Sequence, residues 1–182
     1  GDRLRRLSGQ GGEGADSGGG EAFADLPLPT LPDTSQPFNV LITGIGGTGV
    51  ITVGALIGMA AHIEGKGVSV LDVTGLAQKN GPVTSHVRVA QNAEDLHATR
   101  IAAGAADLVL GCDIVVASGA ECLAKMTPGR TAVIANDHVA PTADFASNPD
   151  LDLSSKAMED TIERCAGSDE LHFVSATALA TA

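Results

Sequence analysis

The sequence predicts an α/β fold: a Rossmann-like three-layer sandwich in which a mostly parallel sheet carries helices on both faces. Short apolar, β-branched runs alternate with longer helical segments along the chain. The chain has no Trp or Tyr and only 4 Phe, so its core must be built from Val, Ile, Leu, Ala and Gly, which suits strands covered on both faces. A glycine-rich turn also joins the first strand directly to the first helix.

The 182 residues divide into a linker and one folded domain. Residues 1–37 are rich in Gly, Pro and Ser, and contain the run Gly18–Gly20. This composition favours flexible or extended chain, so a flexible interdomain linker is expected over residues 1–37 and a folded domain over residues 38–182. A helix start at 176–182 stops with the chain, so we expect a domain truncated at its C-terminus within a longer polypeptide.

The first half of the domain predicts a strand–helix–strand unit. An apolar strand over 38–43 ends at the glycine loop 44–49, and the segment from Val50 to Glu64 is apolar nearly all round, which predicts a buried helix. Gly65–Gly67 ends that helix, and a second strand follows over 68–73. Strands connected in this way are expected to run parallel, joined by a right-handed crossover.

The second half predicts further strands and helices. A loop over 74–84 leads to a strand over 85–90, after which Asn92 caps an Ala-rich helical stretch that runs towards Leu110. Residues 114–116 are the next predicted buried strand, with 108–110 as the alternative. The remaining elements are a short helix at 120–126, a strand at 131–135, a long loop at 136–153, an amphipathic helix at 155–166 with Met158, Ile162 and Cys165 inward, and a strand at 171–174.

Charge and cysteine content exclude several classes of function. With 22 acidic and 11 basic side chains, the net charge is −11, so no nucleic-acid or membrane surface is expected, because binding phosphates needs clustered Lys and Arg. Cys112, Cys122 and Cys165 lack ligand spacing, so neither a disulfide framework nor a metal or iron–sulfur site is expected. There is no signal-peptide pattern, and the longest apolar run, Val50 to Ile63, is too short to span a bilayer, which predicts a soluble cytoplasmic protein.

Gly44, Gly46 and Gly49 match the pattern G-x-G-x-x-G between a strand and a helix. Glycines there permit positive φ and let backbone N–H groups approach an anion at a helix N-terminus. Asp72 closes the second strand, 23 residues after Gly49, where a ribose-binding acid would lie. One alternative is therefore an independent NAD(P)- or flavin-binding oxidoreductase domain. Another is a structural or dimerising module whose glycines serve only packing.

A second loop counts against a dinucleotide site. Where another crossover helix is expected after Asp72, residues 74–82 instead carry Gly75, Gly81 and the cation Lys79. Both glycine-containing loops follow strands, so both are expected at the carboxyl edge of the sheet, where open α/β folds bind ligands. The residues expected to emerge at the same edge are Asn136, Asp137 and His138.

Strand alternation predicts a packing role for His86. It places His86 and Arg88 on one face of the strand and Val87 on the other. Because Ser85 and His86 point to opposite faces, they cannot form a nucleophile–base pair. We therefore expect that His86 packs rather than catalyses.

The two loops and the strand after them resemble one family. Residues 39–50 (NVLITGIGGTGV), 71–81 (LDVTGLAQKNG) and 85–88 (SHVR) are similar to the gamma-type domain of the 2-oxoacid:ferredoxin oxidoreductases, and most similar to the long single-chain indolepyruvate enzymes. The resemblance extends over residues 38–182, and an interdomain linker before this domain agrees with it.

This resemblance implies part of an enzyme that oxidatively decarboxylates a 2-oxoacid, such as pyruvate or indolepyruvate, to an acyl-CoA and reduces ferredoxin. Thiamine diphosphate, Mg and iron–sulfur clusters would lie on other domains or subunits. The chain alone is then expected to be inactive, to hold no cofactor or metal, and to contribute no catalytic residue, although a homo-oligomer is possible. The cofactor-binding residues that the resemblance implies, near the thiamine and CoA, are Gly44, Gly46, Gly47, Thr48, Gly49, Lys79, Asn80 and Gly81.

Two positions of this set carry further expectations. Asn80 stands where Gly is usual in the family, and because Asn tolerates left-handed backbone better than most residues, the loop is expected to persist. Lys79, together with Arg88, is expected either to contact CoA phosphates or a partner domain, or to remain a solvated charge or interface ion pair.

Overall fold

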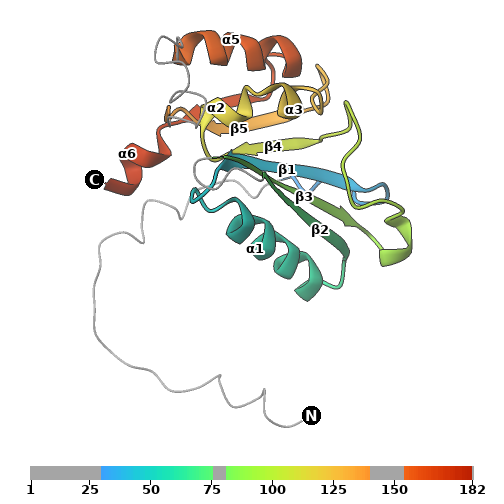
Figure 1. The fold of residues 1–182 in the computed structure, drawn as a ribbon. Helices are drawn as coiled ribbons and strands as arrows, with labels where there is room; N and C mark the ends of the chain where they lie inside the picture. Colours follow the sequence, from blue (N-terminus) through green and yellow to red (C-terminus); the bar gives the residue numbers. More distant parts are fainter. Residues whose placement is uncertain (1–29, 76–80, 140–153, 182) are drawn as a thin grey trace, which may run out of the picture. The chain divides into compact units, whose positions relative to one another are not determined.

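A computed structural model describes residues 30–75, 81–139 and 154–181 (Figure 1). The chain divides into one unit over Gly1–Leu31 and another over Pro32–Ala182, and every helix and strand named below belongs to the second unit. The linker expected over residues 1–37 falls mostly outside the described residues and stays a prediction. Within the described segments, no helix combines the length and apolarity needed to cross a membrane.

A mixed sheet of six strands lies at the centre of the second unit, in the order β2-β3-β1-β4-β5-β6. Strands β1, β4, β5 and β6 pair in parallel, whereas β3 lies antiparallel between β1 and β2. The described sheet thus has three parallel and two antiparallel pairings, which confirms the α/β class. The bounds are β1 (Phe38–Ile45), β2 (Gly67–Thr74), β3 (Pro82–Ala90), β4 (Leu108–Gly111), β5 (Ala132–Asn136) and β6 (Leu171–Val174).

The first two strands run parallel, as expected, but they are not neighbours in the sheet. Helix α1 (Val50–Ile63) does connect them, and they run in the same direction, but β3 separates them and pairs with both. Val87 on β3 lies opposite Val40 on β1 and opposite Val70 on β2. The short connection after β2 can only return as an antiparallel hairpin, so β3 pairs with β2, and the other edge of β3 pairs with β1.

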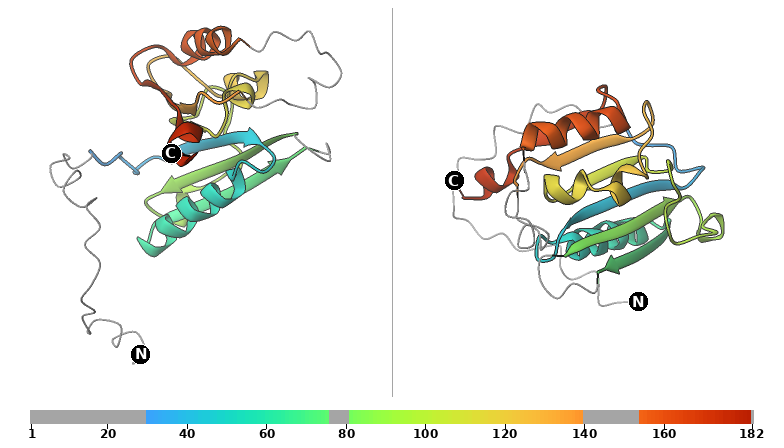
Figure 2. Two further views of the ribbon diagram at one scale, coloured as in Figure 1. Left: turned by 90° about the vertical axis from the view of Figure 1, so that its left-hand side faces the viewer. Right: turned by 45° about the horizontal axis from the view of Figure 1, so that its top comes forward.

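Helices cover both faces of the sheet, and each face has its own core (Figure 2). Along β1, Val40 and Ile42 pack on the side of α1, whereas Leu41 packs on the opposite side. That opposite side is covered by α2 (Ile114–Ala117), with α3 (Ala120–Leu123) and α5 (Ser155–Ala166) around it. This confirms the three-layer arrangement that the composition predicted.

The segment after β3 differs most from the sequence expectation. Asn92 does cap a helix, but this helix is only the 3-10 turn η1 (Ala93–Asp95), and the Ala-rich residues that follow form neither helix nor strand before β4. Residues 114–116, the predicted strand, form the helical turn α2 instead. The cause is Asp113, whose carboxylate accepts the N–H of Val116 at 2.9 Å and starts a helix despite the β-branched run.

Towards the C-terminus the predicted elements are confirmed. Helix α5 and strand β6 have the expected bounds, and α6 (Ala176–Thr181) follows β6. Ile162 on α5 is fully buried, and Met158 and Cys165 pack against the same core. The amphipathic pattern was therefore sufficient to orient this helix.

Helix α1 is buried on one face only, which corrects the expectation of burial all round. Its buried residues are Val50, Gly54, Gly58 and Ala61. Its outer face exposes large apolar side chains, with Leu56 65% and Ile63 77% exposed. The sheet takes one side of the helix, and no described element covers the other.

Candidate functional site

The carboxyl ends of the parallel strands meet at one edge of the sheet. The glycine loop follows β1 here, Cys112 follows β4, and Asn136 ends β5 and precedes Asp137 and His138, as expected. The hairpin between β2 and β3 turns at the same edge, because Ile45 lies opposite Pro82. We call this edge the carboxyl rim.

The two glycine-containing loops are in contact at the carboxyl rim. The N–H of Gly46 donates to the carbonyl of Gly81 at 3.0 Å. This bond confirms that the two loops lie side by side, as far as the second loop is described, which is at Gly81. Lys79 and Asn80 fall outside the described residues.

The glycine loop is a tight turn that only glycine fits at two positions. The carbonyl of Ile45 accepts both the N–H of Thr48, at 3.1 Å, and its hydroxyl, at 2.7 Å. Gly47 has φ +99° and Gly49 has φ +89°, in a region that side chains disfavour. Gly49 is also the N-cap of α1, so the turn leads straight into the helix.

Gly44 and Gly46, the first two glycines of the motif, have different roles. A Cβ on Gly44 would lie 2.5 Å from Oγ1 of Thr48 and 2.9 Å from Cβ of Cys112, so this glycine permits the loop to pack against the end of β4. A Cβ on Gly46 would lie 3.7 Å from the carbonyl oxygen of Gly81, which is an ordinary contact.

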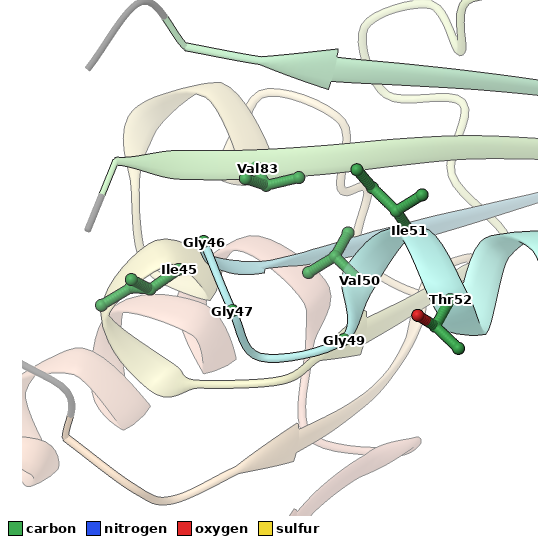
Figure 3. A pocket seen from close by; sticks show the side chains of 8 residues that line it. All are labelled: Ile45, Gly46, Gly47, Gly49, Val50, Ile51, Thr52 and Val83. Carbon is green, nitrogen blue, oxygen red and sulfur yellow. The ribbon is translucent and has the colours of Figure 1, made fainter. Parts of the chain in front are cut away.

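The N-terminus of α1 opens into a pocket of about 310 Å³. In Figure 3 the loop from Gly46 to Gly49 runs along one side of this pocket, across from Val83 on β3. The first bond of the helix runs from the N–H of Val53 to the carbonyl of Gly49, at 2.9 Å, and no side chain caps the helix. The pocket is lined by Ile45, Gly46, Gly47, Gly49, Val50, Ile51, Thr52 and Val83.

The backbone of this pocket favours an anion. Within the described residues, the N–H groups of Val50, Ile51 and Thr52 have no acceptor, as is usual for the first turn of a helix. Free N–H groups and the positive end of the helix dipole together attract negative charge. The site is therefore built from backbone rather than from catalytic side chains.

A second pocket, of about 520 Å³, lies on the other side of Thr48 among the ends of β4, β5 and β6. Here Asn136 donates to the carbonyl of Cys112 at 3.1 Å and to the hydroxyl of Thr177 at 3.0 Å, and accepts from the N–H of Ala176 at 3.1 Å. Asn136 thus ties β4 and β5 to the start of α6. Burial, followed by the charge of Asp113, raises the pKa of Cys112, so this thiol is not activated as a nucleophile.

Sequence reasoning missed Asp113, which is fully buried below the glycine loop. One carboxylate oxygen accepts the N–H of Ile45 at 2.7 Å, and the other accepts that of Val116. Burial raises the pKa of this carboxyl group, and the bonds from Val116 and Ile45 oppose that effect. An acid placed between an apolar strand and a helix start was the available signal, but the expected strand at 114–116 concealed it.

Asp72 and Arg88 lie away from the pocket. Asp72 pairs with Ser85 on β3, so a whole strand separates β2 from β1, a distance of about 10 Å between strands that would be neighbours in a dinucleotide-binding fold. Arg88 lies opposite Asn39, towards the other edge of the sheet, and its Nε donates to the Asn39 side chain at 2.8 Å. Neither residue is placed to bind a ligand at the glycine loop.

His86 is a packed histidine in the described structure. It is 1% exposed, its Nδ1 accepts the N–H of Ile101 at 3.3 Å, and its Nε2 has no partner among the described residues. Burial, and then the positive charges of Arg100 and Lys125, lower its pKa, while Glu121 acts in the opposite direction. His86 is therefore neutral near pH 7, with the proton on Nε2.

This burial predicts a pH dependence of stability. Unfolding restores a pKa near 6.5, so below that pH the unfolded chain binds a proton that the folded chain resists. The free energy of unfolding is expected to decrease as the pH falls through about 6.5. Denaturant titrations between about pH 8 and about pH 5.5 should show a shallower decrease for His86→Asn, whose amide oxygen can replace Nδ1. For the exposed control His97→Gln, the free energy of unfolding should change with pH as it does in the wild type. The same change with pH in all three proteins would contradict the prediction.

Among residues 30–75, 81–139 and 154–181, no three His, Cys, Asp or Glu side chains gather to hold a metal ion. The same residues include all three cysteines, and each is a free thiol.

Comparison with known proteins places the chain in a family. The model of the family "Pyruvate ferredoxin/flavodoxin oxidoreductase" matches residues 39–181. Indolepyruvate oxidoreductase subunit IorB of Methanothermobacter thermautotrophicus is 31% identical over 131 residues, which cover 72% of this chain and 63% of that protein. The subunit of the same name from Archaeoglobus fulgidus is 34% identical over 120 residues, 63% of this chain and 55% of that protein. The chain thus spans less than two thirds of either relative.

Two solved structures share the fold. Pyruvate oxidoreductase subunit PORC of Thermotoga maritima matches with a TM-score of 0.53 and 16% identity, over 80% of this chain and 65% of that one. The 2-oxoglutarate:ferredoxin oxidoreductase of Magnetococcus marinus, solved with 2-oxoglutarate, coenzyme A and succinyl-CoA bound, also has a TM-score of 0.53, with 18% identity over 80% of this chain and 21% of that one. These likenesses confirm the architecture, and the match over residues 39–181 shows that the chain belongs to the pyruvate ferredoxin/flavodoxin oxidoreductase family.

Proposed function

We propose that the chain is the gamma-type domain of an indolepyruvate-type oxidoreductase, which oxidatively decarboxylates a 2-oxoacid to an acyl-CoA and reduces ferredoxin. Family membership and the similarity to indolepyruvate oxidoreductase subunits support this assignment. In this proposal thiamine diphosphate, Mg and the iron–sulfur clusters are held by other domains or subunits, and the chain alone is inactive.

The part of this chain in the reaction is to bind a phosphate group of coenzyme A at the glycine loop. The observation that carries the proposal is the uncapped N-terminus of α1, whose free N–H groups open into a pocket beside two touching glycine loops. Gly47 and Gly49 give the loop its shape, Gly44 its close packing, and Gly46, Thr48 and Gly81 its internal hydrogen bonds. Lys79 and Asn80 lie outside the described residues, and the family resemblance is what includes them in the proposed site.

The exposed apolar face of α1 favours the proposal that another domain or subunit binds there. Its large apolar side chains are Ile51, Leu56, Met59 and Ile63, all at least 45% exposed. Exposed large apolar side chains gathered on one helix often mark an interface. Ile51 also lines the pocket, so a partner on this face would reach the bound phosphate.

Replacement of Gly47 by Ala tests the proposed site. A Cβ there meets nothing within 4 Å, so the change acts only through the backbone, where φ +99° strains a side chain by about 1–2 kcal/mol. We expect the KM for CoA to rise about tenfold, with the KM for the 2-oxoacid little changed. The measurement is CoA-dependent viologen reduction by the full-length enzyme.

Gly129→Ala is the matched control, because Gly129 also has positive φ, +74°, and also meets nothing within 4 Å. It precedes β5 and so lies away from the carboxyl rim. Lys79→Ala should raise the KM for CoA as well. Gly129→Ala should keep the wild-type KM for CoA. If Gly47→Ala and Lys79→Ala keep it too, the loop serves packing only and the proposal is wrong. A rise confined to the KM for the 2-oxoacid would assign the loop to the other substrate.

A further inference from the structure

The carboxylate of Asp113 joins two elements that meet below the proposed phosphate site. Asp113 is 0% exposed, and its two oxygens accept the N–H of Ile45 at 2.7 Å and that of Val116 at 2.9 Å. Ile45 is the last residue of β1, and Val116 is in the first turn of α2. No ion pair among the described residues includes Asp113.

A helix can begin without a charged side chain at its N-cap. Helix α5 is capped in the same protein by the neutral side chain of Ser154, which accepts the N–H of Ala157 at 3.4 Å. A buried carboxylate costs more than a hydroxyl, and burial raises the pKa of Asp113. What Asp113 adds is a second oxygen, which reaches the end of β1.

The bond to Ile45 lies at the start of the glycine loop. The carbonyl of Ile45 accepts the N–H and the hydroxyl of Thr48, and the next N–H, of Gly46, donates to Gly81. The backbone of Ile45 is therefore bonded to Asp113 through its N–H and to Thr48 through its carbonyl, at the start of the turn. From that turn the chain passes through Gly49 into α1.

We propose that Asp113 is a positioning residue: it fixes the end of β1 and thereby directs the free N–H groups of α1 at the bound phosphate. This assignment rests on the function proposed above for the glycine loop. Asp113 itself does not touch the ligand, because its oxygens are buried and engaged by Ile45 and Val116.

The test compares Asp113→Ser with Ser154→Ala in the full-length enzyme. Asp113→Ser keeps an oxygen for the N-cap of α2 but cannot also reach Ile45, so we expect the KM for CoA to rise about tenfold. Ser154→Ala removes the cap of a different helix, α5, with no bond to β1 or the glycine loop, and should leave the KM for CoA unchanged. A merely structural role would reduce the amount of folded enzyme, and so kcat, without changing this KM.

Hydrogen exchange and a milder variant keep the test decisive. The Ile45 amide of Asp113→Ser should exchange faster than in the wild type, while amides of α5 should not. If Asp113→Ser does not fold, Asp113→Asn keeps an acceptor for one N–H and should still raise the KM for CoA. An unchanged KM for CoA in the folded variant overturns the assignment. If Gly47→Ala then raises that KM, the proposed phosphate site survives without Asp113; if Gly47→Ala has no effect either, the site itself is wrong.

Discussion

Replacement of Gly67 by Ala is expected to lower the free energy of unfolding by about 3 kcal/mol, at the upper end of the usual cost of overpacking. Gly67 begins β2 and is buried against the chain that follows β3. A Cβ would lie 2.3 Å from the carbonyl carbon and oxygen of Asn92 and 2.5 Å from the backbone nitrogen of Ala93. Backbone atoms cannot rotate away as a side chain does, so the end of the hairpin must open.

Thermal unfolding of the 182-residue chain measures this effect, and a decrease in Tm of roughly 6–12 °C is expected for a domain of this size. Gly46→Ala is the control, since its Cβ would make only ordinary contacts, at 3.7 and 3.9 Å. The interpretation fails if Gly67→Ala unfolds within about 2 °C of Gly46→Ala.

Local sequence signals were sufficient to predict the segments whose structure depends mainly on their own residues. The glycine loop joins an apolar strand to a helix, and the structure places this unit where the sequence predicted it. The amphipathic pattern of α5 likewise gave both its bounds and its inward face. In these segments, periodicity and turn residues agree with the tertiary packing.

Long-range pairing decided the rest of the fold. No residue of β3 shows by itself that this strand lies between β1 and β2. Its pairing with β1 is long-range and depends on the packing of the whole sheet. The run Ile114–Val116 has strand preference, but the buried cap at Asp113 makes it helical. The apolar outer face of α1 looked like core because composition does not tell a buried helix face from an exposed one.

The candidate site was predictable only where it depends on local sequence. The motif predicted a tight glycine turn at the start of a helix, and the order of strands and loops correctly placed the two glycine-containing loops at one edge. It did not distinguish Gly44, which permits close packing, from Gly47, which has positive φ outside the motif positions. Nor did it find Asp113, whose role depends on an N–H group 68 residues away in the chain.

The second large effect is expected at the contact between α1 and β3. A Cβ on Gly54 would lie 2.4 Å from Oγ of Ser85 and 3.1 Å from its Cβ. Ala normally favours a helix interior by about 1 kcal/mol over Gly, yet here the clash should outweigh that gain, and we expect a net loss of about 1–2 kcal/mol of stability. Denaturant unfolding of Gly54→Ala measures it.

A double-mutant cycle shows whether the clash is the cause. The hydroxyl of Ser85 is buried without a hydrogen-bond partner among the described residues, so Ser85→Ala alone should be neutral or slightly stabilising. Combined with Gly54→Ala it removes the closest contact, and we expect about 1 kcal/mol or more of stability to return. Thr43→Val is the control: Thr43 also has a buried, unpaired hydroxyl, but it follows Leu41 on the other face of β1 and should add without coupling.

The same cycle relates packing to the proposed site. Gly54 lies one turn beyond the free N–H groups of Val50 to Thr52, so a helix pushed off β3 by the new methyl group also moves those groups. In the full-length enzyme, Gly54→Ala should therefore raise the KM for CoA, and the added Ser85→Ala should restore it together with stability. Recovery of stability without recovery of the KM would show that the position of α1 on β3 does not govern phosphate binding.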